Sequence, residues 1–356
     1  MKITDITYEK VRVKLASPFV VAIGVIDTCE TLIVKVETDE GITGYGEASP
    51  FAPVTGELID TIPQFIGLFK PHLIGLNPLE LEKVHKIMDR LTAGNTSAKA
   101  GIDIALYDIL GKWLNEPLYK VLGGYRNAFG TDVTVGINTP EKMAESALDC
   151  VVREGYTVIK VKAGINPADD VRAIRLIRQA VGQDVTLRVD ANQGWDVRTA
   201  ISTLSAYEEF GVEAVEQPLP WWDLDGLAFL RGRSRIRLMV DESLHSPQDA
   251  LKIMKKEAAD TFNIKLMKSG GIYPALRINA IGESGGVNCM VGCMLETRLG
   301  IAAGAHLVAG QKNITEADLD SFREYGDSGG ISGGFTVSGG VMTLLEEPGL
   351  GIKVNF

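Results

Sequence analysis

Short apolar runs alternate with helix-like segments through the middle of the chain. Each run is rich in β-branched residues, and successive runs begin roughly 25 residues apart, which suits a parallel strand, a crossover helix and two loops. The runs are Asp132–Ile137, Thr157–Lys162, Thr186–Asp190, Ala214–Glu216, Arg237–Asp241, Thr261–Lys265, Val287–Met294 and Thr315–Asp320. Eight such units favour a closed parallel barrel over an open doubly wound sheet, and few helical residues follow the last run.

The two ends of the chain have a different pattern. Residues 1–125 combine expected antiparallel strands with expected helices. The strands are Lys2–Val13, Thr31–Thr38 and Ile42–Gly46, and the helices include Leu79–Leu91 and Ser97–Leu114. The Gly-rich tail contains further strand-like runs. The sequence therefore predicts an α+β capping domain at 1–125, a barrel with the active site at 126–325, and a C-terminal segment at 326–356 that completes the cap.

The composition narrows the classes of function. Hydrophobic residues make up 45% and charged residues 23% of the 356 residues, as in ordinary globular proteins. With 36 basic and 46 acidic residues the net charge is −10, which argues against nucleic-acid and membrane partners. The sequence has no membrane-length apolar run, no signal-peptide pattern and no Cys-x-x-Cys, so we expect a cytoplasmic protein with reduced thiols.

Three acidic residues stand at the carboxyl ends of neighbouring strands. Asp190, Glu216 and Asp241 end the third, fourth and fifth runs, where the active sites of parallel barrels form. Three converging carboxylates repel one another unless a cation lies between them. Ligation by oxygen alone favours Mg²⁺. The alternative is that each carboxylate separately caps the helix that follows it.

Lysines end two runs on opposite sides of the expected barrel. Lys162 ends the second run and Lys265 ends the sixth, four strands away, while Lys160 shares the face of Lys162. A nearby dication is expected to lower the pKa of these ammonium groups toward neutrality, which makes them usable bases. Two bases on opposite faces of a metal-bound carboxylate predict a 1,1-proton transfer through a metal-stabilised enolate. The alternative is that the lysines only form salt bridges with the carboxylates.

Together these motifs resemble the enolase superfamily, and within it the muconate-lactonizing-enzyme-like subgroup. The matching motifs are Lys160-x-Lys162, Asp190-x-Asn192, Glu216-Gln217-Pro218, Asp241-Glu242-Ser243 and Asn263–Gly271. The resemblance implies a modified TIM barrel of the (β/α)7β type, Mg²⁺ on the three carboxylates, and Lys162 and Lys265 as the paired acid and base. It also implies that Lys160 neutralises the substrate carboxylate or enolate, and that Asn192 and Glu242 are auxiliary residues.

A pair of carboxylates on the eighth run separates the reactions of this subgroup. Asp318 and Asp320 are two residues apart on a strand, so they point the same way and suit a cationic group. They resemble the Asp-x-Asp that holds the substrate's α-ammonium in dipeptide epimerases of the subgroup. The resemblance therefore implies a homo-oligomeric enzyme that inverts the α-carbon of the C-terminal residue of L,L-dipeptides and uses no organic cofactor.

The expected cap loops bear on the choice of dipeptide. Segments around Phe19–Val25 and Phe51–Glu57 are expected to close over the site. Subgroup members that act on Ala-Glu tend to carry an Arg in the first of these loops, whereas the segment here has no cation, which favours apolar dipeptides. Lys268, one turn beyond Lys265, has no predicted role. Further residues expected to line the substrate pocket are Thr134, Cys293, Met294 and Leu295.

Other functions are open on the same scaffold. An o-succinylbenzoate synthase, an N-acylamino-acid racemase and a muconate-type cycloisomerase all act on substrates without an ammonium group, so Asp318 and Asp320 are the feature that distinguishes them from a dipeptide epimerase. A non-catalytic binding protein is disfavoured by the complete set of three carboxylates and two lysines. Murein-peptide recycling and general peptide catabolism are both compatible with an epimerase.

Overall fold

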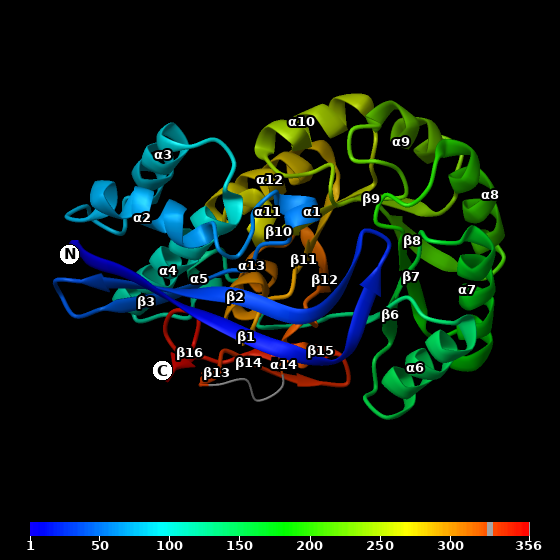
Figure 1. The fold of residues 1–356 in the computed structure, drawn as a ribbon, viewed down its shortest axis with the longest axis horizontal. Coiled ribbons are helices and arrows are strands. Elements are labelled where there is room, and N and C mark those ends of the chain that lie inside the picture. Colours follow the sequence, from blue (N-terminus) through cyan, green and yellow to red (C-terminus); the bar gives the residue numbers. More distant parts are fainter. Residues whose placement is uncertain (326–329, 356) are drawn as a thin grey trace.

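A ring of parallel strands lies at the centre of the computed structural model, which describes residues 1–325 and 330–355. Within these residues eight strands pair in order from β5 to β12. They are β5 (Val133–Val135), β6 (Val158–Lys162), β7 (Thr186–Asp190), β8 (Val212–Glu216), β9 (Arg237–Val240), β10 (Thr261–Lys265), β11 (Asn288–Gly292) and β12 (Ile314–Asp318). The N–H of Asp132 donates to the carbonyl of Ala317 at 3.1 Å, which joins the two end strands. The predicted parallel barrel is confirmed (Figure 1).

A helical segment follows each strand from β5 to β11, and these helices surround the barrel. They are α6 (Pro140–Val152), α7 (Pro167–Val181), α8 (Val197–Glu208), α9 (Leu224–Arg231), α10 (Pro247–Lys256), α11 (Leu266–Ser269), α12 (Ile272–Gly285) and α13 (Arg298–Gly310). Asn166, Asp196 and Ser246 accept the first backbone N–H groups of α7, α8 and α10. In the described part of the chain, β12 is followed only by the single turn α14 (Phe322–Tyr325) before the tail, as the (β/α)7β prediction requires. No described helix is both long and apolar enough to cross a membrane.

The N-terminal region forms an antiparallel sheet with helices packed against it. Its strands are β1 (Ile3–Val21), β2 (Gly24–Thr38) and β3 (Thr43–Ala48), and its helices are α1 (Ala52–Thr55), α2 (Ile62–Leu73), α3 (Leu81–Leu91), α4 (Thr96–Leu114) and α5 (Leu118–Val121). β3 and α4 approach so closely that a Cβ at Gly46 would lie 2.0 Å from the carbonyl oxygen of Gly101. Glycine is required at this crossing because any side chain would collide with the helix backbone.

The segment Phe19–Val25, predicted as a loop, is instead the tip of a long hairpin. β1 and β2 stay paired as far as Val21 and Gly24, and the predicted first strand, which ended at Val13, is too short. A register shift between Lys14 and Phe19 carries the strand past the interruption in its alternating pattern. The hairpin reaches from the cap toward the mouth of the barrel (Figure 1).

The C-terminal tail returns to the N-terminal region, and both chain ends lie on the same side of the molecule (Figure 1). β4 (Ala128–Gly130) pairs with β15 (Val341–Leu344), which pairs with β14 (Phe335–Ser338), while β13 (Ile331–Gly333) pairs with β16 (Ile352–Val354). The N–H of Leu350 donates to Asp108 of α4 at 2.9 Å, and the N–H of Leu118 donates to Gly349 at 2.8 Å. Residues 326–329 and Phe356 of the predicted segment 326–356 lie outside the described residues. The domain limits at 125 and 325 stay a prediction.

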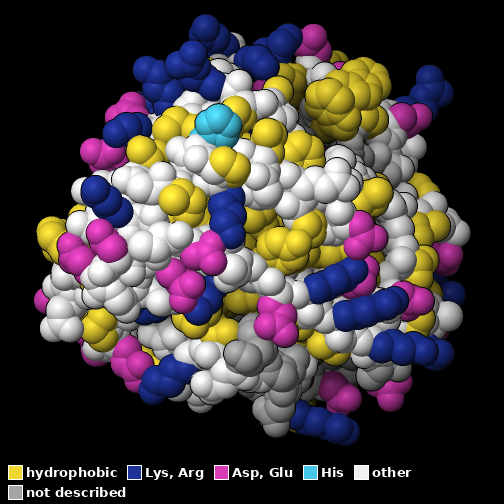
Figure 2. All heavy atoms as spheres, turned by 60° about the vertical axis from the view of Figure 1, so that its left-hand side comes forward, with side chains coloured by type: hydrophobic (Ala, Val, Ile, Leu, Met, Phe, Trp, Pro, Cys, Tyr) yellow, Lys and Arg dark blue, Asp and Glu magenta, His cyan; other side chains and the backbone are white. Residues whose placement is uncertain are grey.

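The surface carries charges of both signs. On the face drawn in Figure 2, Lys and Arg side chains lie among Asp and Glu side chains, with hydrophobic groups between them. Large exposed apolar side chains include Trp221 and Trp222, in the loop between β8 and α9. A mixed surface of this kind agrees with the moderate net charge of −10.

A layer of charged side chains fills the barrel beneath the strand ends. Arg188 of β7 donates to Glu213 at 2.9 Å, and its guanidinium also lies 3.0 Å from Glu316 and 3.4 Å from Asp132. The Asp132 side chain is fully buried. A carboxylate in such a place needs a cationic partner, because removing one member of a buried ion pair leaves an uncompensated charge.

Replacing Arg188 by Met is expected to lower the free energy of unfolding by about 3–5 kcal/mol, because Asp132 loses its cationic partner. Denaturant unfolding followed by circular dichroism measures the loss. Arg175→Met, at an exposed position of α7, is the control and should change the value by about 0.5 kcal/mol or less. An Arg188→Met protein as stable as the parent would show that the barrel does not depend on this ion network.

Candidate active site

Three carboxylates meet at the carboxyl ends of neighbouring strands. Asp190 ends β7 and lies in register with Glu216, which ends β8, and Asp241 directly follows β9. Oxygen atoms of the three side chains lie within 4.8 Å of one another, and all three residues are buried. Parallel pairing therefore brings together acidic residues that are about 25 positions apart along the chain.

Lysines surround these carboxylates. The Nζ of Lys160 lies 3.2 Å from Asp190, 2.8 Å from Glu216 and 2.7 Å from Asp318. The Nζ of Lys162 lies 2.6 Å from Asp190 Oδ2. On the far side of the barrel, the Nζ of Lys265 lies 2.8 Å from Asp241 Oδ2. Since β7, β8 and β9 lie between β6 and β10, the acidic cluster separates Lys162 from Lys265.

Charges and burial act against each other in the cluster. Burial, together with the neighbouring Asp190 carboxylate, raises the pKa of Glu216 to about 7. Burial also opposes ionisation of Asp241, but Lys265 and Lys268 hold the pKa of that carboxyl well below its usual range. The lowering of the lysine pKa that a dication is expected to cause stays a prediction, and the charges of the protein alone act in the opposite direction on Lys265. Burial lowers the pKa of Lys265, but nearby carboxylates, Asp241 foremost, raise it more.

The donor set suits Mg²⁺. It consists of carboxylate oxygens, the ligands that hard divalent cations prefer. Asn263 of β10 donates to Glu216 Oε1 at 2.7 Å and so holds that carboxylate in place. Oxygen atoms of Asp190, Glu216 and Asp241 lie within 4.8 Å of one another, so one dication between them could be bound by all three carboxylates.

Asn192 and Glu242 contact each other behind the carboxylates. Asn192 accepts from Lys162 at 3.3 Å, and its side-chain amide donates to Glu242 at 3.2 Å. The backbone N–H of Asn192 also donates to Asp190 at 2.9 Å. Burial and the adjacent Asp241 carboxylate raise the pKa of Glu242 to about 8. The pair thus links the end of β7 to the end of β9.

Gln217 joins the ends of β8 and β9, a role that the sequence did not reveal. Its side-chain oxygen accepts the N–H groups of Asp241 at 2.9 Å and Ser243 at 3.2 Å. Its amide nitrogen donates to Leu219 and to the hydroxyl of Ser243, both at 2.9 Å. Gln217 has a left-handed φ of 37°, which persists in a non-glycine residue only where surrounding contacts enforce it. The one signal in the sequence was its position next to Glu216.

Lys268, which had no predicted role, contacts the acidic cluster directly. Its side chain is fully buried and lies against the carboxylate and the backbone carbonyl of Asp241. It also donates to the backbone carbonyl of Asn263 at 3.1 Å. The short helix α11 turns the chain immediately after Lys265, so the side chain of Lys268 points back over the strand ends. A signal for this arrangement was the second lysine one turn after the first.

The Asp-x-Asp pair lies beside the lysines. β12 ends at Asp318, two residues earlier than predicted, and Asp320 follows the strand. Ligand atoms of the two carboxylates and of Cys293 lie within 4.8 Å of one another. Burial opposes ionisation of Asp318, but Lys160 and Lys265 lower its pKa to about 2. Asp320 accepts the N–H of Thr134 at 2.7 Å, and burial and Asp318 raise its pKa to about 6.

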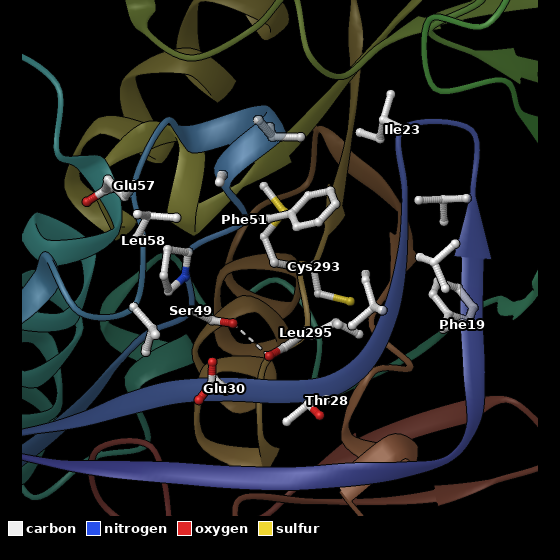
Figure 3. A pocket seen from close by; sticks show the side chains of 18 of the residues that line it. Phe19, Ile23, Thr28, Glu30, Ser49, Phe51, Glu57, Leu58, Cys293 and Leu295 are labelled. Atoms are coloured by element: carbon white, nitrogen blue, oxygen red, sulfur yellow. Dashed lines mark hydrogen bonds between the residues drawn. The ribbon is translucent and has the colours of Figure 1, made fainter.

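Two cavities open onto this cluster. The larger, of about 500 Å³, lies between the β1–β2 hairpin, residues 49–60 and the barrel mouth (Figure 3), and its lining residues include Lys162 and Lys265. The smaller, of about 70 Å³, is bounded by Thr134, Asp318 and Asp320. Residues that follow β11 line both cavities: Cys293, Met294 and Leu295.

The cap is fastened to the barrel beside the larger cavity. Glu47 of β3 accepts the hydroxyl of Thr297 at 2.6 Å, the N–H of Thr297 at 2.8 Å and the N–H of Gly300 at 2.8 Å. The hydroxyl of Ser49 donates to the carbonyl of Leu295 at 2.6 Å (Figure 3). These bonds hold cap residues and pocket residues in one arrangement.

The chain is similar to known proteins over its whole length. Residues 3–123 match the mandelate racemase / muconate lactonizing enzyme N-terminal domain, and residues 142–356 match the enolase C-terminal domain-like family. A hydrophobic dipeptide epimerase from Enterococcus faecalis is 43% identical, covering 99% of this chain and 100% of the relative. An L-Ala-D/L-Glu epimerase from Clostridium acetobutylicum is 41% identical and covers 99% of both. An N-succinyl-L-Arg/Lys racemase from Bacillus cereus is also 41% identical, covering 100% of this chain and 96% of the relative.

A solved structure of a dipeptide epimerase is also similar to this chain over its whole length. The Enterococcus faecalis dipeptide epimerase, complexed with Mg and the dipeptide L-Leu-L-Tyr, has a TM-score of 0.96 to this chain at 43% identity. The similarity covers 99% of this chain and 100% of that one. The motifs, the barrel and the two family matches agree, and the chain belongs to the mandelate racemase and muconate lactonizing enzyme family of the enolase superfamily.

Proposed function

We propose that this chain is a Mg²⁺-dependent dipeptide epimerase, an isomerase that inverts the α-carbon of the C-terminal residue of L,L-dipeptides. The observation that carries the proposal is that two kinds of catalytic group lie together. The carboxylates of Asp190, Glu216 and Asp241 form one cluster, and the lysines Lys162 and Lys265 lie on either side of it. A carboxylate pair for an ammonium group lies next to the same lysines.

The lysines carry out the proton transfer. Asp190, Glu216 and Asp241 would hold Mg²⁺, which when bound supplies positive charge to the substrate carboxylate as the α-proton leaves. One of Lys162 and Lys265 starts as the free amine and takes the α-proton. The other starts as the ammonium and gives its proton to the opposite face, so the α-carbon inverts and the proton count is unchanged.

The Asp318 and Asp320 pair favours a dipeptide over an N-acyl amino acid. The buried carboxylate of Asp318 and the half-buried carboxylate of Asp320 lie side by side and are stabilised by a cation, and the free α-ammonium of a dipeptide supplies one. Lys160 lies 2.7 Å from Asp318, and a substrate ammonium between the two carboxylates would add a cation beside Asp320. An N-acyl group brings no positive charge to this place.

The larger cavity favours an apolar side chain on the C-terminal residue. Apolar side chains make up somewhat more than half of its lining residues, and Ile23 and Phe51 face it from the cap (Figure 3). Among the described lining residues the cations are Lys162 and Lys265. The other charged lining residues outside the acidic cluster are all acidic: Asp27, Glu30, Glu57 and Asp60. Lys10 lies 3.1 Å from Glu30 and 3.2 Å from Asp60, so it is already paired, and the lining offers no further cation to a glutamate side chain, which disfavours Ala-Glu.

An N-acylamino-acid racemase is the second candidate. The same two lysines could transfer the α-proton in that reaction, and one relative is the N-succinyl-L-Arg/Lys racemase from Bacillus cereus. The o-succinylbenzoate synthase and cycloisomerase reactions stay alternatives on the same scaffold. In each of these cases Asp318 and Asp320 would be structural carboxylates. A single substitution at Asp320 therefore separates the dipeptide reaction from the others.

Incubation with Mg²⁺ and pooled L,L-dipeptides in D₂O is expected to add one deuteron to apolar dipeptides, as measured by mass spectrometry. Asp320→Asn should lower kcat/KM for dipeptides by roughly 30-fold or more, because a charge pair with the ammonium in the cavity is lost. The same variant should leave exchange of N-acyl amino acids unchanged or improved. Deuterium gain on N-acyl amino acids and on no dipeptide would replace the proposal by the second candidate, and gain on Ala-Glu alone would refute the apolar preference.

A further inference from the structure

The two cavities divide the substrate between them, if it binds as the proposed function requires. The α-carbon of the C-terminal residue lies between Lys162 and Lys265, with its carboxylate toward the acidic cluster and its amide nitrogen toward Asp318 and Asp320. The remaining substituent, the side chain, then points into the cavity of about 500 Å³. The N-terminal residue occupies the cavity of about 70 Å³, where its ammonium meets the carboxylate pair.

Phe19 of β1 lines both cavities. The carbonyl of the next residue, Val20, accepts the N–H of Ile137 at 3.0 Å, which ties the hairpin to the end of β5. The ring lies so close to Gly136 that a Cβ there would be 3.2 Å from it. Phe19 is therefore held between the hairpin and the barrel, near the hairpin tip drawn in Figure 3.

We propose that Phe19 is a specificity-determining residue, which excludes aromatic side chains from the N-terminal position of the dipeptide and favours small ones such as Ala and Ser. The dipeptide epimerase would then be asymmetric in size, with a small first residue and a large apolar second residue. This inference rests on the proposed function and deepens it, because it names the class of dipeptide that the site accepts.

The size of the smaller cavity supports this limit. At roughly 10–15 Å³ for each water-sized group, 70 Å³ holds about five to seven such groups. The ammonium, α-carbon and methyl group of an N-terminal Ala fit within that room, whereas the corresponding part of Phe, with its ring, does not. Expanding a well-packed pocket forces neighbouring side chains out of their preferred rotamers.

The other walls of the smaller cavity are also fixed by hydrogen bonds. Asp320 is bound to the N–H of Thr134 at 2.7 Å. The hydroxyl of Ser321 donates to the carbonyl of Glu296 at 2.9 Å. Movement of Asp320 or Ser321 would break these bonds, whereas the ring of Phe19 can be shortened by substitution without the loss of a hydrogen bond.

The test keeps the C-terminal residue constant and varies the first. We expect kcat/KM for L-Ala-L-Leu to exceed that for L-Phe-L-Leu at least tenfold in the parent enzyme, since a pocket that is too small rejects extra bulk by this order. In Phe19→Ala this ratio should fall at least tenfold. Val25→Ala is the control, because Val25 lines the larger cavity and does not line the smaller one. It should alter turnover of both dipeptides by a similar factor and leave their ratio unchanged.

Phe19→Leu is a second variant, in case Phe19→Ala disrupts the hairpin. Its ratio of kcat/KM for L-Ala-L-Leu to that for L-Phe-L-Leu should lie between the ratios of the parent and Phe19→Ala. Equal turnover of the two dipeptides by the parent would overturn the inference and leave dipeptide epimerisation intact. A ratio that does not move in either Phe19 variant would do the same. Absence of α-proton exchange on every dipeptide would overturn the proposed function itself.

Discussion

Replacing either Lys162 or Lys265 by Ala should reduce epimerisation by roughly 10²–10⁴-fold, because each inversion needs one lysine to take a proton and the other to give one. The sharper result concerns exchange in D₂O. Each single variant should retain α-proton exchange for the one epimer whose proton faces the remaining lysine. The two variants should therefore retain exchange on opposite epimers, as read by ¹H NMR of each pure epimer.

The structure supports the use of these variants. Asp190 keeps Lys160 at 3.2 Å when Lys162 is lost, and Asp241 keeps Lys268 when Lys265 is lost. Neither carboxylate is left without a cation, so both variants are expected to fold. Lys255→Ala, at an exposed position of α10, is the matched control and should retain full activity. Retained exchange on the same epimer in both lysine variants would contradict an arrangement on opposite faces.

Loss of a metal ligand should have an effect of similar size. In Glu216→Gln we expect weaker Mg²⁺ binding by isothermal titration calorimetry and a loss of activity of roughly 100-fold or more, since a bound dication contributes several kcal/mol of charge stabilisation. Chelation by EDTA should abolish activity in the parent, and added Mg²⁺ should restore it. Calorimetry reports the binding defect independently of turnover.

The Glu216→Gln substitution should leave the contacts of the neighbouring residues largely unchanged. The amide oxygen of Gln can still accept from Asn263, and Lys160 keeps its contacts with Asp190 and Asp318. Glu209→Gln, at an exposed position after α8, is the control and should bind Mg²⁺ as the parent does. Unchanged Mg²⁺ affinity in Glu216→Gln would show that the cation is held elsewhere.

The residues at the strand ends were predictable because, in a parallel barrel, the carboxyl ends of all strands lie on the same side. Apolar runs that finish in Asp190, Glu216 and Asp241 must bring those side chains to one end of a parallel barrel, whatever the details of packing. The opposition of Lys162 and Lys265 follows from counting strands. These inferences need the order of strands and nothing about individual contacts.

Contacts that depend on side-chain reach were not predictable. Lys160 contacts Asp318 as well as the two neighbouring acidic residues, which requires the barrel to close. Lys268 reaches Asp241 only because α11 turns immediately after β10. The hairpin at Phe19–Val25 was missed because its register shift breaks the alternation by which strands are recognised. The sign of the Lys265 pKa shift depends on the sum of many nearby charges, which a motif does not provide.

The bond between Leu350 and Asp108 also sets an order of events during synthesis. The two residues are 242 positions apart, so a ribosome that adds roughly 5–20 residues per second delivers Leu350 about 10–50 s after Asp108. Through this interval α4 lacks a partner that it holds in the finished protein, while β5 to β12 emerge one after another. The contact between α4 and the tail can therefore form only after all eight barrel strands have been synthesised, so it is among the last long-range contacts that the chain can make.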